Sequence, residues 1–555
     1  MSSWQWLLWL AAILVVGVAL RFYQLGQVPV SLYWDETAIL VDARAVAATG
    51  QDMHGNHWLQ AIFPSYGDYK LPVYIWLASL SVKTFGASEW AVRLPNAVAG
   101  LGTIFISGAI VWQLFPKLVL RRRQSLALLT MAGLAITPWS ILFSRTGFEG
   151  HLGQFLLAAS LWLALKSRQN RWWLLGSVLF GSLATYSYYS VRFVWPVVFA
   201  AAVLLITPPT KQRRWRQLAV GLALPLVLYA ASLLPIQRSP LYEASQQFRL
   251  STDSVLNAAD WPVESNSYKL QAGNGLIDKL TYHPWVLRGR ELAKNYSDNL
   301  SFDLLFVSGD SNLRHGTGRH GLFLWPLFIP FLYGWYTIFH KHWRQGSWLL
   351  IWWLAALLPA SVPEETPHAL RSLNALVPLS VVIGWGAWQL WLAPFVQRFK
   401  KLSLLAAATI TALLVFDFTS YYFQAYPAAS AADWQAGYKE LAATIWQSKD
   451  AVDEVWVQPF DGRFYLWLMA YQLPPEAYQQ LAYRQYQPLA IDNLHFQRFA
   501  WETLLGERQN IMIVDEQASL DHQLETAPLV PQIYQTVLLE NGQPAYAMAI
   551  FESSK

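Results

Sequence analysis

Long apolar stretches separated by short polar connections occupy the chain up to about residue 420. A helix needs about 20 apolar residues to cross a bilayer, and shorter stretches suffice where neighbouring helices cover them. By this criterion the sequence predicts an α-helical polytopic membrane protein with about eleven spans. We expect the spans near residues 5–22, 96–116, 125–144, 152–166, 172–190, 192–208, 218–235, 321–340, 347–362, 373–396 and 402–418.

The pattern changes at about residue 420, where shorter alternating segments replace the long apolar ones. Such segments are typical of a small soluble domain with strands and helices. The sequence therefore predicts a transmembrane domain over 1–419 and a small α/β domain over 420–555. The elements expected in the second domain are two strands, two helices and a hairpin, at 453–458, 510–514, 464–471, 496–505 and 533–551 respectively.

Short basic tracts follow alternate apolar stretches and contain no Asp or Glu. Because Lys and Arg concentrate on the cytoplasmic side of membrane proteins, we assign these tracts and the N-terminus to the cytoplasm. The outer segments are then 23–95, 145–151, the turn near 190, 236–320, 363–372 and everything after 419. The tracts are Lys117 with Arg121, Arg122 and Arg123; Lys166, Arg168 and Arg171; Lys211, Arg213, Arg214 and Arg216; Lys341 and Arg344; and Arg398, Lys400 and Lys401.

Two segments of the first outer loop are predicted to be interfacial helices. Asp35 is placed to cap a helix that runs to about Ala48 and ends at Gly50, with one apolar stripe facing the membrane surface. The apolar stretch 71–86 is short, and a crossing there would reverse the side of every later loop. We therefore place this stretch in the interface or as a re-entrant segment. A signal peptide is not expected, because no basic segment or small-residue cleavage site flanks residues 4–20.

Composition supports a membrane protein and removes several chemistries. Only 14% of the residues are charged and 54% are hydrophobic, whereas roughly 25% are charged in soluble domains. The chain has no cysteine, which excludes disulfides, thiolate nucleophiles and cysteine-based metal sites. The net charge of +5 is explained by the basic tracts, so we expect membrane lipids and no nucleic acid as partners.

The residues that could support catalysis all fall in the predicted outer segments. Adjacent residues on a helix point about 100° apart, so at most one of Asp35 and Glu36 is expected to react. The alternative is a purely structural role, in which Asp35 only caps its helix and Glu36 only complements the helix dipole. The other candidates are Asp68, Lys70, Glu149, Arg192, Asp310, Arg314, His368 and Arg371.

These acids and cations lie at the depth of lipid headgroups, while the spans carry almost no ionisable residue. A transporter or pump would be expected to hold charges near the middle of the membrane. His368 and Arg371 would share one side of a helix and could grip a phosphate. Lys70 could also bind a phosphate. The alternative is that its side chain only extends toward the membrane interface. We therefore favour an enzyme that acts on a lipid-linked, phosphate-bearing substrate.

The order of these motifs resembles that of bacterial GT-C membrane glycosyltransferases. The similar members are the protein O-mannosyltransferase-like and aminoarabinose-transferase-like enzymes, and the likeness covers about residues 5–395. The motifs are Asp35-Glu36, Lys70-Leu-Pro72, Phe85-Gly-Ala-Ser-Glu89-Trp-Ala-Val-Arg93-Leu-Pro95, Glu149, Leu305-Phe-Val-Ser-Gly-Asp310-Ser-Asn-Leu-Arg314-His315-Gly, and His368-Ala-Leu-Arg371.

The resemblance implies transfer of one sugar, with inversion, from a polyprenyl-phosphate donor to an acceptor protein, lipid or glycan outside the membrane. Asp35 would be the base that accepts the acceptor's hydroxyl proton, Glu36 would position sugar or acceptor, and Glu149 would orient a substrate. The departing lipid phosphate would be stabilised by Lys70, Arg371, Arg192 and His368. Acceptor contacts or loop order are expected from Asp68, Asp310 and Arg314.

No cofactor is firmly expected from the resemblance. The same analogy leaves open a divalent metal bound among Asp35, Glu149 and His54 or His57. Two other functions also stay open: a glycan ligase or oligosaccharyltransferase that moves a preassembled glycan, and a flippase or transporter of lipid-linked sugar.

Overall fold

The structure is a computed structural model that divides into two compact units, each described by itself. The first unit is Met1–Tyr23 with Asn96–Thr419, and the second is Gln24–Pro95 with Ser420–Lys555. The first outer loop therefore groups with the residues after 419. The structure describes residues 3–207, 219–251, 254–256, 261–458, 462–484, 487–499, 510–526, 531–539 and 542–551. The basic tract at 211–216 lies outside these ranges.

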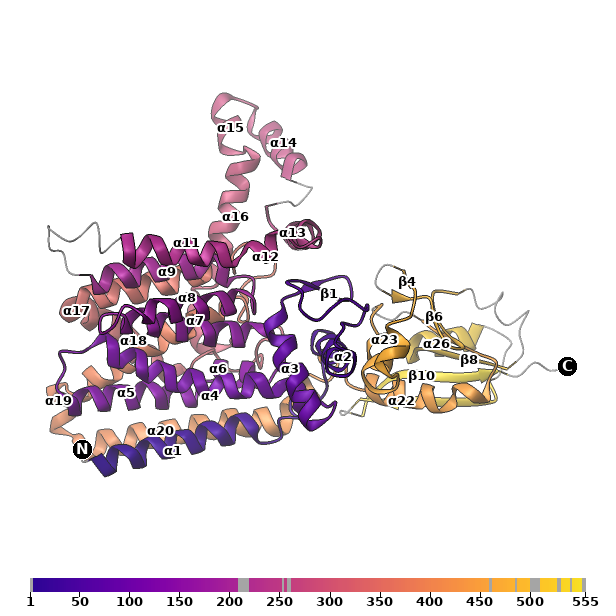
Figure 1. Ribbon diagram of the computed structural model, residues 1–555, viewed down its shortest axis with the longest axis horizontal. Coiled ribbons are helices and arrows are strands. Elements are labelled where there is room, and N and C mark those ends of the chain that lie inside the picture. The colour runs from indigo at the N-terminus through magenta and orange to yellow at the C-terminus, as the bar shows by residue number, and fades with distance from the viewer. Residues whose placement is uncertain are drawn as a thin grey trace. The chain divides into compact units, whose positions relative to one another are not determined.

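The first unit is a bundle of apolar helices (Figure 1). Helix α17 packs against α18 and α9, α7 packs against α8 and α9, and α18 packs against α5. The helices of the bundle are α1 Ser3–Phe22, α4 Glu89–Leu114, which begins in the second unit, α5 Leu120–Ala135, α6 Pro138–Ser144, α7 Glu149–Lys166, α8 Trp173–Thr185, α9 Val191–Ile206, η1 Ala219–Ala223, α11 Leu224–Ser232, α12 Leu234–Gln237, α17 Phe328–Leu357, η4 Leu373–Ala375, α18 Leu376–Trp391, α19 Pro394–Arg398 and α20 Lys400–Ser420.

Within the described ranges, five helical segments are long and apolar enough to cross a membrane. A sixth is obtained if α5 and α6, which are bent by 61°, count as one broken span. These helices indicate a membrane protein, while the number of about eleven spans and their orientation stay predictions. The five segments are Trp4–Phe22, Glu89–Leu114, Val220–Gln237, Leu373–Trp391 and Lys400–Ala429.

Three predicted spans differ from the helices found: one is broken and two are joined. The span expected at 125–144 breaks between α5 and α6, where Pro138 occupies the first position of α6 and lacks the N–H needed to continue the preceding helix. The spans expected at 321–340 and 347–362 are two helices joined in α17, and only His342 leaves helical geometry, with φ −145° and ψ 54°. The connection predicted between them is therefore a kink.

The long segment between α12 and α17 in the first unit is mostly helical and ends in a turn-rich segment. Helices α14 to α16 extend away from the bundle (Figure 1). The short η2 precedes a glycine-rich stretch that leads back into the bundle at η3. The bounds are α13 Tyr242–Ser251, α14 Trp261–Ala272, α15 Leu276–Thr281, α16 Pro284–Asp298, η2 Asp303–Val307 and η3 Trp325–Leu327.

The second unit contains a six-stranded mixed sheet in the order β6-β7-β3-β8-β10-β9. The central strand β3 runs parallel to β7 and β8, and the other neighbours are antiparallel. The sheet strands are β3 Glu454–Val457, β6 Ala490–Ile491, β7 Leu494–Phe496, β8 Ile511–Glu516, β9 Ile533–Leu538 and β10 Pro544–Phe551; β4 Tyr483–Arg484 pairs with β5 Gln487–Pro488. The helices after the bundle are η5 Tyr421–Ala425, α21 Tyr426–Ala429, α22 Tyr438–Ser448, η6 Lys449–Ala451, α23 Tyr465–Tyr471, α24 Pro475–Tyr478 and α26 Gln517–Thr526.

Most elements expected after residue 420 are present. Strands β3 and β8, helix α23 and the antiparallel pair β9 and β10 lie where the sequence predicts them. The helix expected at 496–505 is wrong at its start, because Phe496 ends strand β7 and pairs with β3. Residues 500–505 and Asn541 lie outside the described ranges.

The segment Gln24–Pro95 of the second unit supplies helix α2 Trp34–Thr49, the short antiparallel strands β1 Phe63–Pro64 and β2 Tyr69–Lys70, and helix α3 Pro72–Phe85. Helix α2 ends at Gly50, whose φ of 72° suits glycine. The single apolar stripe predicted for α2 is wrong, because residues 36–43 are buried on every side of the helix. Contacts with α3, α23 and α24 account for this burial.

Helix α3 keeps one apolar face open. Leu77, Leu80 and Phe85 are exposed, while Tyr74, Ile75 and Ala78 are fully buried. An exposed apolar face is what an interfacial helix requires. Its position in the membrane interface stays a prediction.

Candidate active site

Asp35 lies in the first turn of α2 and does not cap the helix. Tyr33 is the N-cap residue, and Glu36 performs the capping contact by accepting the backbone N–H of Tyr33 at 3.3 Å. The prediction that Asp35 caps the helix is therefore wrong. The carboxylate of Asp35 is directed to other partners, so helix capping does not explain this residue.

The partners of Asp35 come from the β1–β2 hairpin. Lys70 Nζ lies 2.6 Å from Asp35 Oδ1, and the hydroxyl of Tyr66 donates a hydrogen bond to the same oxygen. Asp68 Oδ2 lies 3.8 Å from Lys70 Nζ. The Lys70 side chain is 3% exposed, whereas that of Asp35 is 26% exposed. The result is a carboxylate that small molecules can reach, held by a buried lysine.

Tyr66 acts as a hydrogen-bond donor in this cluster. Burial raises the pKa of its phenol well above the usual value, and the negative charges of Asp35 and Asp68 raise it further. The phenol therefore stays protonated at neutral pH. Its proton and the Lys70 ammonium together stabilise the ionised form of Asp35.

Glu36 is buried behind Asp35 and binds Arg93. Arg93 Nε lies 3.1 Å from Glu36 Oε1, and both side chains are fully buried. The same guanidinium donates to the carbonyls of Leu25, Pro29 and Ser31 at 3.2, 2.9 and 2.6 Å. These contacts fix the segment that leads into α2, so they give Glu36 a structural role. Its predicted role in positioning sugar or acceptor stays a prediction.

Residues from the C-terminal part of the second unit border the Asp35 cluster. The guanidinium of Arg463 lies 3.9 Å from the ring centre of Trp34 and 5.2 Å from that of Tyr66. Gln435 accepts the backbone N–H of Trp34 at 2.9 Å. Arg463, Gln435 and Tyr66 could not be selected from the sequence, because their proximity to Asp35 depends on the tertiary fold.

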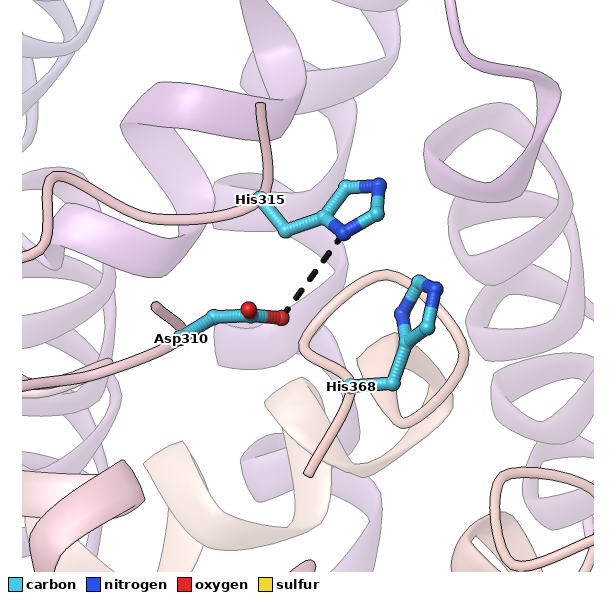
Figure 2. A group of neighbouring side chains, drawn as sticks. All are labelled: Asp310, His315 and His368. Carbon is cyan, nitrogen blue, oxygen red and sulfur yellow. Dashed lines mark ion pairs between the residues drawn. The ribbon is translucent and has the colours of Figure 1, made fainter. Parts of the chain in front are cut away.

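A second cluster, in the first unit, contains Asp310, His315 and His368 (Figure 2). Asp310 and His315 lie in the stretch after η2, and His368 lies in the outer segment before η4. Asp310 Oδ2 is 3.8 Å from His315 Nδ1, and the two imidazole ring centres are 4.3 Å apart. Asp310 is fixed by the backbone N–H groups of Ala369 and Asn312, at 2.8 and 2.9 Å.

Burial determines the charge of this second cluster. It raises the pKa of Asp310 from its usual value to about 6. It also lowers the pKa of His368 well below its usual value, with further lowering by His315, Arg371 and Arg314. His368 is therefore neutral at pH 7 and can bind a phosphate only as a neutral hydrogen-bond donor.

The segment 363–372 is formed by turns, so His368 and Arg371 are not on a helix as the spacing suggested. They are still linked, because the Arg371 backbone N–H donates to His368 Nδ1 at 3.3 Å. Among the described residues, Arg371 Nη1 and the Nε and Nη2 atoms of Arg192 are buried without a hydrogen-bond partner. These guanidinium groups retain donors for an anion.

The other predicted residues have defined positions in the first unit. Glu149 is the first residue of α7, and its carbonyl accepts a hydrogen bond from Ser187 at 3.1 Å. Arg192 lies in the first turn of α9, with its guanidinium 4.6 Å from the ring centre of Tyr189. Arg314 donates through its backbone N–H and Nε to Asn312 Oδ1, both at 3.1 Å. The last two contacts support a role for Arg314 in ordering its loop.

The surroundings of Asp35 do not fit the divalent metal that the analogy left open. An ammonium group already contacts Asp35 Oδ1, and a second cation there would be repelled. His57 Nδ1 accepts the N–H of Leu59, and His54 packs edge-on against Tyr483. In the described part of the chain, the one group of three side chains with metal-ligand geometry is Asp310, His315 and His368.

Comparisons with known proteins agree with the motif order found in the sequence. Residues 69–234 match the dolichyl-phosphate-mannose-protein mannosyltransferase family. The resemblance predicted from the sequence is confirmed. Two proteins of Bacillus subtilis (strain 168), YycA and YkcB, carry the names of candidate mannosyltransferases and are 29% and 26% identical over 178 and 242 residues.

These two alignments cover 31% and 41% of this chain, and 24% and 31% of the relatives' own lengths. Over nearly full length, the fold is similar to that of ArnT from Cupriavidus metallidurans. The structure of ArnT bound to undecaprenyl phosphate superposes with a TM-score of 0.54 at 15% identity, covering 99% of this chain and 98% of ArnT. The apo structure gives the same TM-score at 14% identity, covering 98% and 97%.

Proposed function

We propose that the chain is an integral membrane glycosyltransferase that moves one sugar from a polyprenyl-phosphate donor to an acceptor at the outer face of the membrane. The observation that carries the proposal is the Asp35 carboxylate, which is 26% exposed and bonded to the buried Lys70. The family match and the undecaprenyl phosphate bound by ArnT support a lipid-linked donor. The description of the matched family makes polyprenyl-phosphate mannose the first donor to test.

The proposed reaction is a single displacement with inversion. The acceptor hydroxyl oxygen attacks the anomeric carbon of the sugar while the bond from that carbon to the phosphate oxygen breaks. The hydroxyl proton passes to Asp35, and the bonding electrons leave with the polyprenyl phosphate. Because a phosphate is a good leaving group without protonation, one base suffices, unlike the two-carboxylate glycosidases.

Lys70 has two roles in this proposal. Its ammonium keeps Asp35 ionised and therefore able to accept a proton. It is also a compact positive charge that can stabilise the developing phosphate charge. In the first unit, Arg192 and Arg371 retain buried donors and are proposed to bind phosphate oxygens. Glu149 is proposed to orient a substrate.

The test is sugar transfer by purified protein from radiolabelled polyprenyl-phosphate mannose, comparing Asp35→Asn with Asp450→Asn. Asp450 is a matched control because it also pairs with a lysine, Lys449, at 2.7 Å, and its side chain is 83% exposed. We expect Asp35→Asn to abolish transfer and Asp450→Asn to leave it unchanged. Transfer that survives in Asp35→Asn would contradict the assignment of the base.

A lipid-linked sugar flippase would behave differently in reconstituted vesicles. It would move labelled lipid between leaflets without consuming it, and Asp35→Asn would not alter that movement. A glycan ligase would require a diphosphate-linked preassembled glycan and would leave the monophosphate donor unused.

A further inference from the structure

We propose that Asp310, His315 and His368 form a zinc site whose fourth ligand is an anion or water. The three side chains come from two segments that are more than fifty residues apart in sequence, and their ligand atoms all lie within 4.8 Å of one another. The carboxylate of Asp310 faces the ring of His315, with the ring of His368 beside them (Figure 2).

The distances are close to those of a metal centre. Zinc binds nitrogen and oxygen ligands at about 2.0–2.2 Å in a tetrahedron, so two ligands lie about 3.4 Å apart. Asp310 Oδ2 and His315 Nδ1 are 3.8 Å apart. Small side-chain rotations would therefore bring all three ligands to bonding distance.

The surroundings of His368 place its ring as a metal ligand. His368 is 4% exposed, and its ring centre lies 4.3 Å from that of His315. Its Nδ1 already presents a lone pair to the backbone N–H of Arg371 at 3.3 Å, which is a long and weak hydrogen bond.

The surrounding contacts hold these ligands in place. Both oxygens of Asp310 accept backbone N–H groups, from Ala369 and Asn312. The backbone N–H of His368 donates to Asn299 Oδ1 at 3.1 Å. Gly316 lets the chain pass close to Asp310, because a Cβ at Gly316 would lie 2.4 Å from the Asp310 carbonyl oxygen. Such supporting contacts are typical of metal sites.

The ligand set and the neighbouring charges define what would bind. Two imidazoles and one carboxylate favour zinc over magnesium or calcium, which prefer all-oxygen ligands. Arg371 follows His368 in the same turn-rich segment, and its Nη1 is buried without a hydrogen-bond partner. Its positive charge would oppose a bare cation, so the open fourth position is expected to take an anion such as phosphate or hydroxide.

The test measures how much zinc the full chain takes up after purification in detergent and removal of bound metal with a chelator. We expect about one zinc per chain by elemental analysis, and at least about tenfold weaker binding in Asp310→Asn, His315→Gln and His368→Gln. His57→Gln, which changes an exposed histidine of the second unit, is the matched control and should bind zinc as the wild type does. Wild-type protein without stoichiometric zinc, or equal binding in all variants, would overturn the proposal.

Two further measurements make the test independent of variant folding. Wild-type protein loaded with Co2+ should show the intense visible absorption of four-coordinate cobalt, and its absence would overturn the site. Inorganic phosphate should strengthen zinc binding by the wild type, and the gain should be smaller in Arg371→Gln. No gain in the wild type would overturn the anion as fourth ligand. None of these results depends on sugar transfer.

Discussion

Asp35 lies in the first turn of α2 and Asp310 in the stretch after η2, and different groups hold their carboxylates. A lysine ammonium and a tyrosine hydroxyl bind Asp35, whose side chain is 26% exposed. Two backbone N–H groups bind Asp310, whose side chain is 3% exposed and lies beside a histidine. The contact with the Lys70 ammonium favours the ionised form of Asp35, whereas burial raises the pKa of Asp310 to about 6.

This difference assigns the two clusters to different chemistry. An exposed carboxylate can accept a proton from a substrate hydroxyl. A buried carboxylate beside two imidazoles is better matched to a ligand that brings its own positive charge.

Arg93→Met removes the buried guanidinium behind Asp35. Glu36 then stays buried without its ionic partner, which costs about 3–5 kcal/mol. The apparent Tm in detergent should fall strongly, and the double variant Arg93→Met/Glu36→Gln should recover part of the loss. An unchanged Tm in Glu36→Gln together with lost transfer would instead support a direct role for Glu36 at the sugar.

Lys70→Met removes the charge that holds Asp35. We expect the transfer rate to fall about 10²–10³-fold, the usual effect of losing one group that stabilises transition-state charge. Lys439→Met is the control, because Lys439 forms a similar pair with Glu89 at 2.6 Å in the same unit. A rate for Lys70→Met equal to that of the control would remove Lys70 from the mechanism.

Asp42→Asn tests a buried acid on the same helix as Asp35. Burial, followed by the charge of Asp52, raises the pKa of Asp42 well above its usual value of 3.8. The folded protein therefore binds more protons here than the unfolded chain does, and stability falls as pH rises above about 4. Asp42→Asn should remove this loss and stabilise the protein at pH 7 by about 1–3 kcal/mol.

The measurement is the apparent Tm of both proteins between about pH 4 and pH 8. The wild-type Tm should decrease relative to that of Asp42→Asn as the pH rises. Parallel Tm curves for the two proteins would show that Asp42 does not contribute to the pH dependence.

Arg463→Ala should have the smallest effect of the series. Its guanidinium lies over the rings of Trp34 and Tyr66, and such a contact is worth about 0.5–1 kcal/mol where water has access. We expect the KM for the donor or the acceptor to rise about two- to fivefold, with partial recovery in Arg463→Lys. Identical kinetics in wild type and Arg463→Ala would show that this contact does not affect the site.

Much of the fold could be predicted from apolar length and turn residues. The bend at Pro138 and the end of α2 at Gly50 follow from the chemistry of proline and glycine. The burial of α2 could not be predicted, because α23 and α24, which lie more than four hundred residues later, cover it together with α3. The side chain of Arg44, for example, donates to the carbonyl of Ala470 in α23 at 2.7 Å.

The candidate residues were predicted better than their roles. Asp35, Asp68 and Lys70 could be selected from the motif order, and the structure brings them together. That Glu36 binds Arg93 while Asp35 binds Lys70 depends on helix phase and on a hairpin register, which the sequence does not reveal. Likewise, His368 carries no charge because burial lowers its pKa and the neighbouring His315, Arg371 and Arg314 lower it further.

The most direct test of the account separates donor binding from sugar transfer in Asp35→Asn. Both would be measured with one radiolabelled polyprenyl-phosphate sugar and the same purified protein. We predict donor affinity and apparent Tm close to those of the wild type, with the single-turnover transfer rate reduced about 10²–10⁴-fold, as expected for loss of a general base. A transfer rate within about threefold of the wild type would contradict the account, because the activation free energy would then have changed by less than a tenfold rate effect requires.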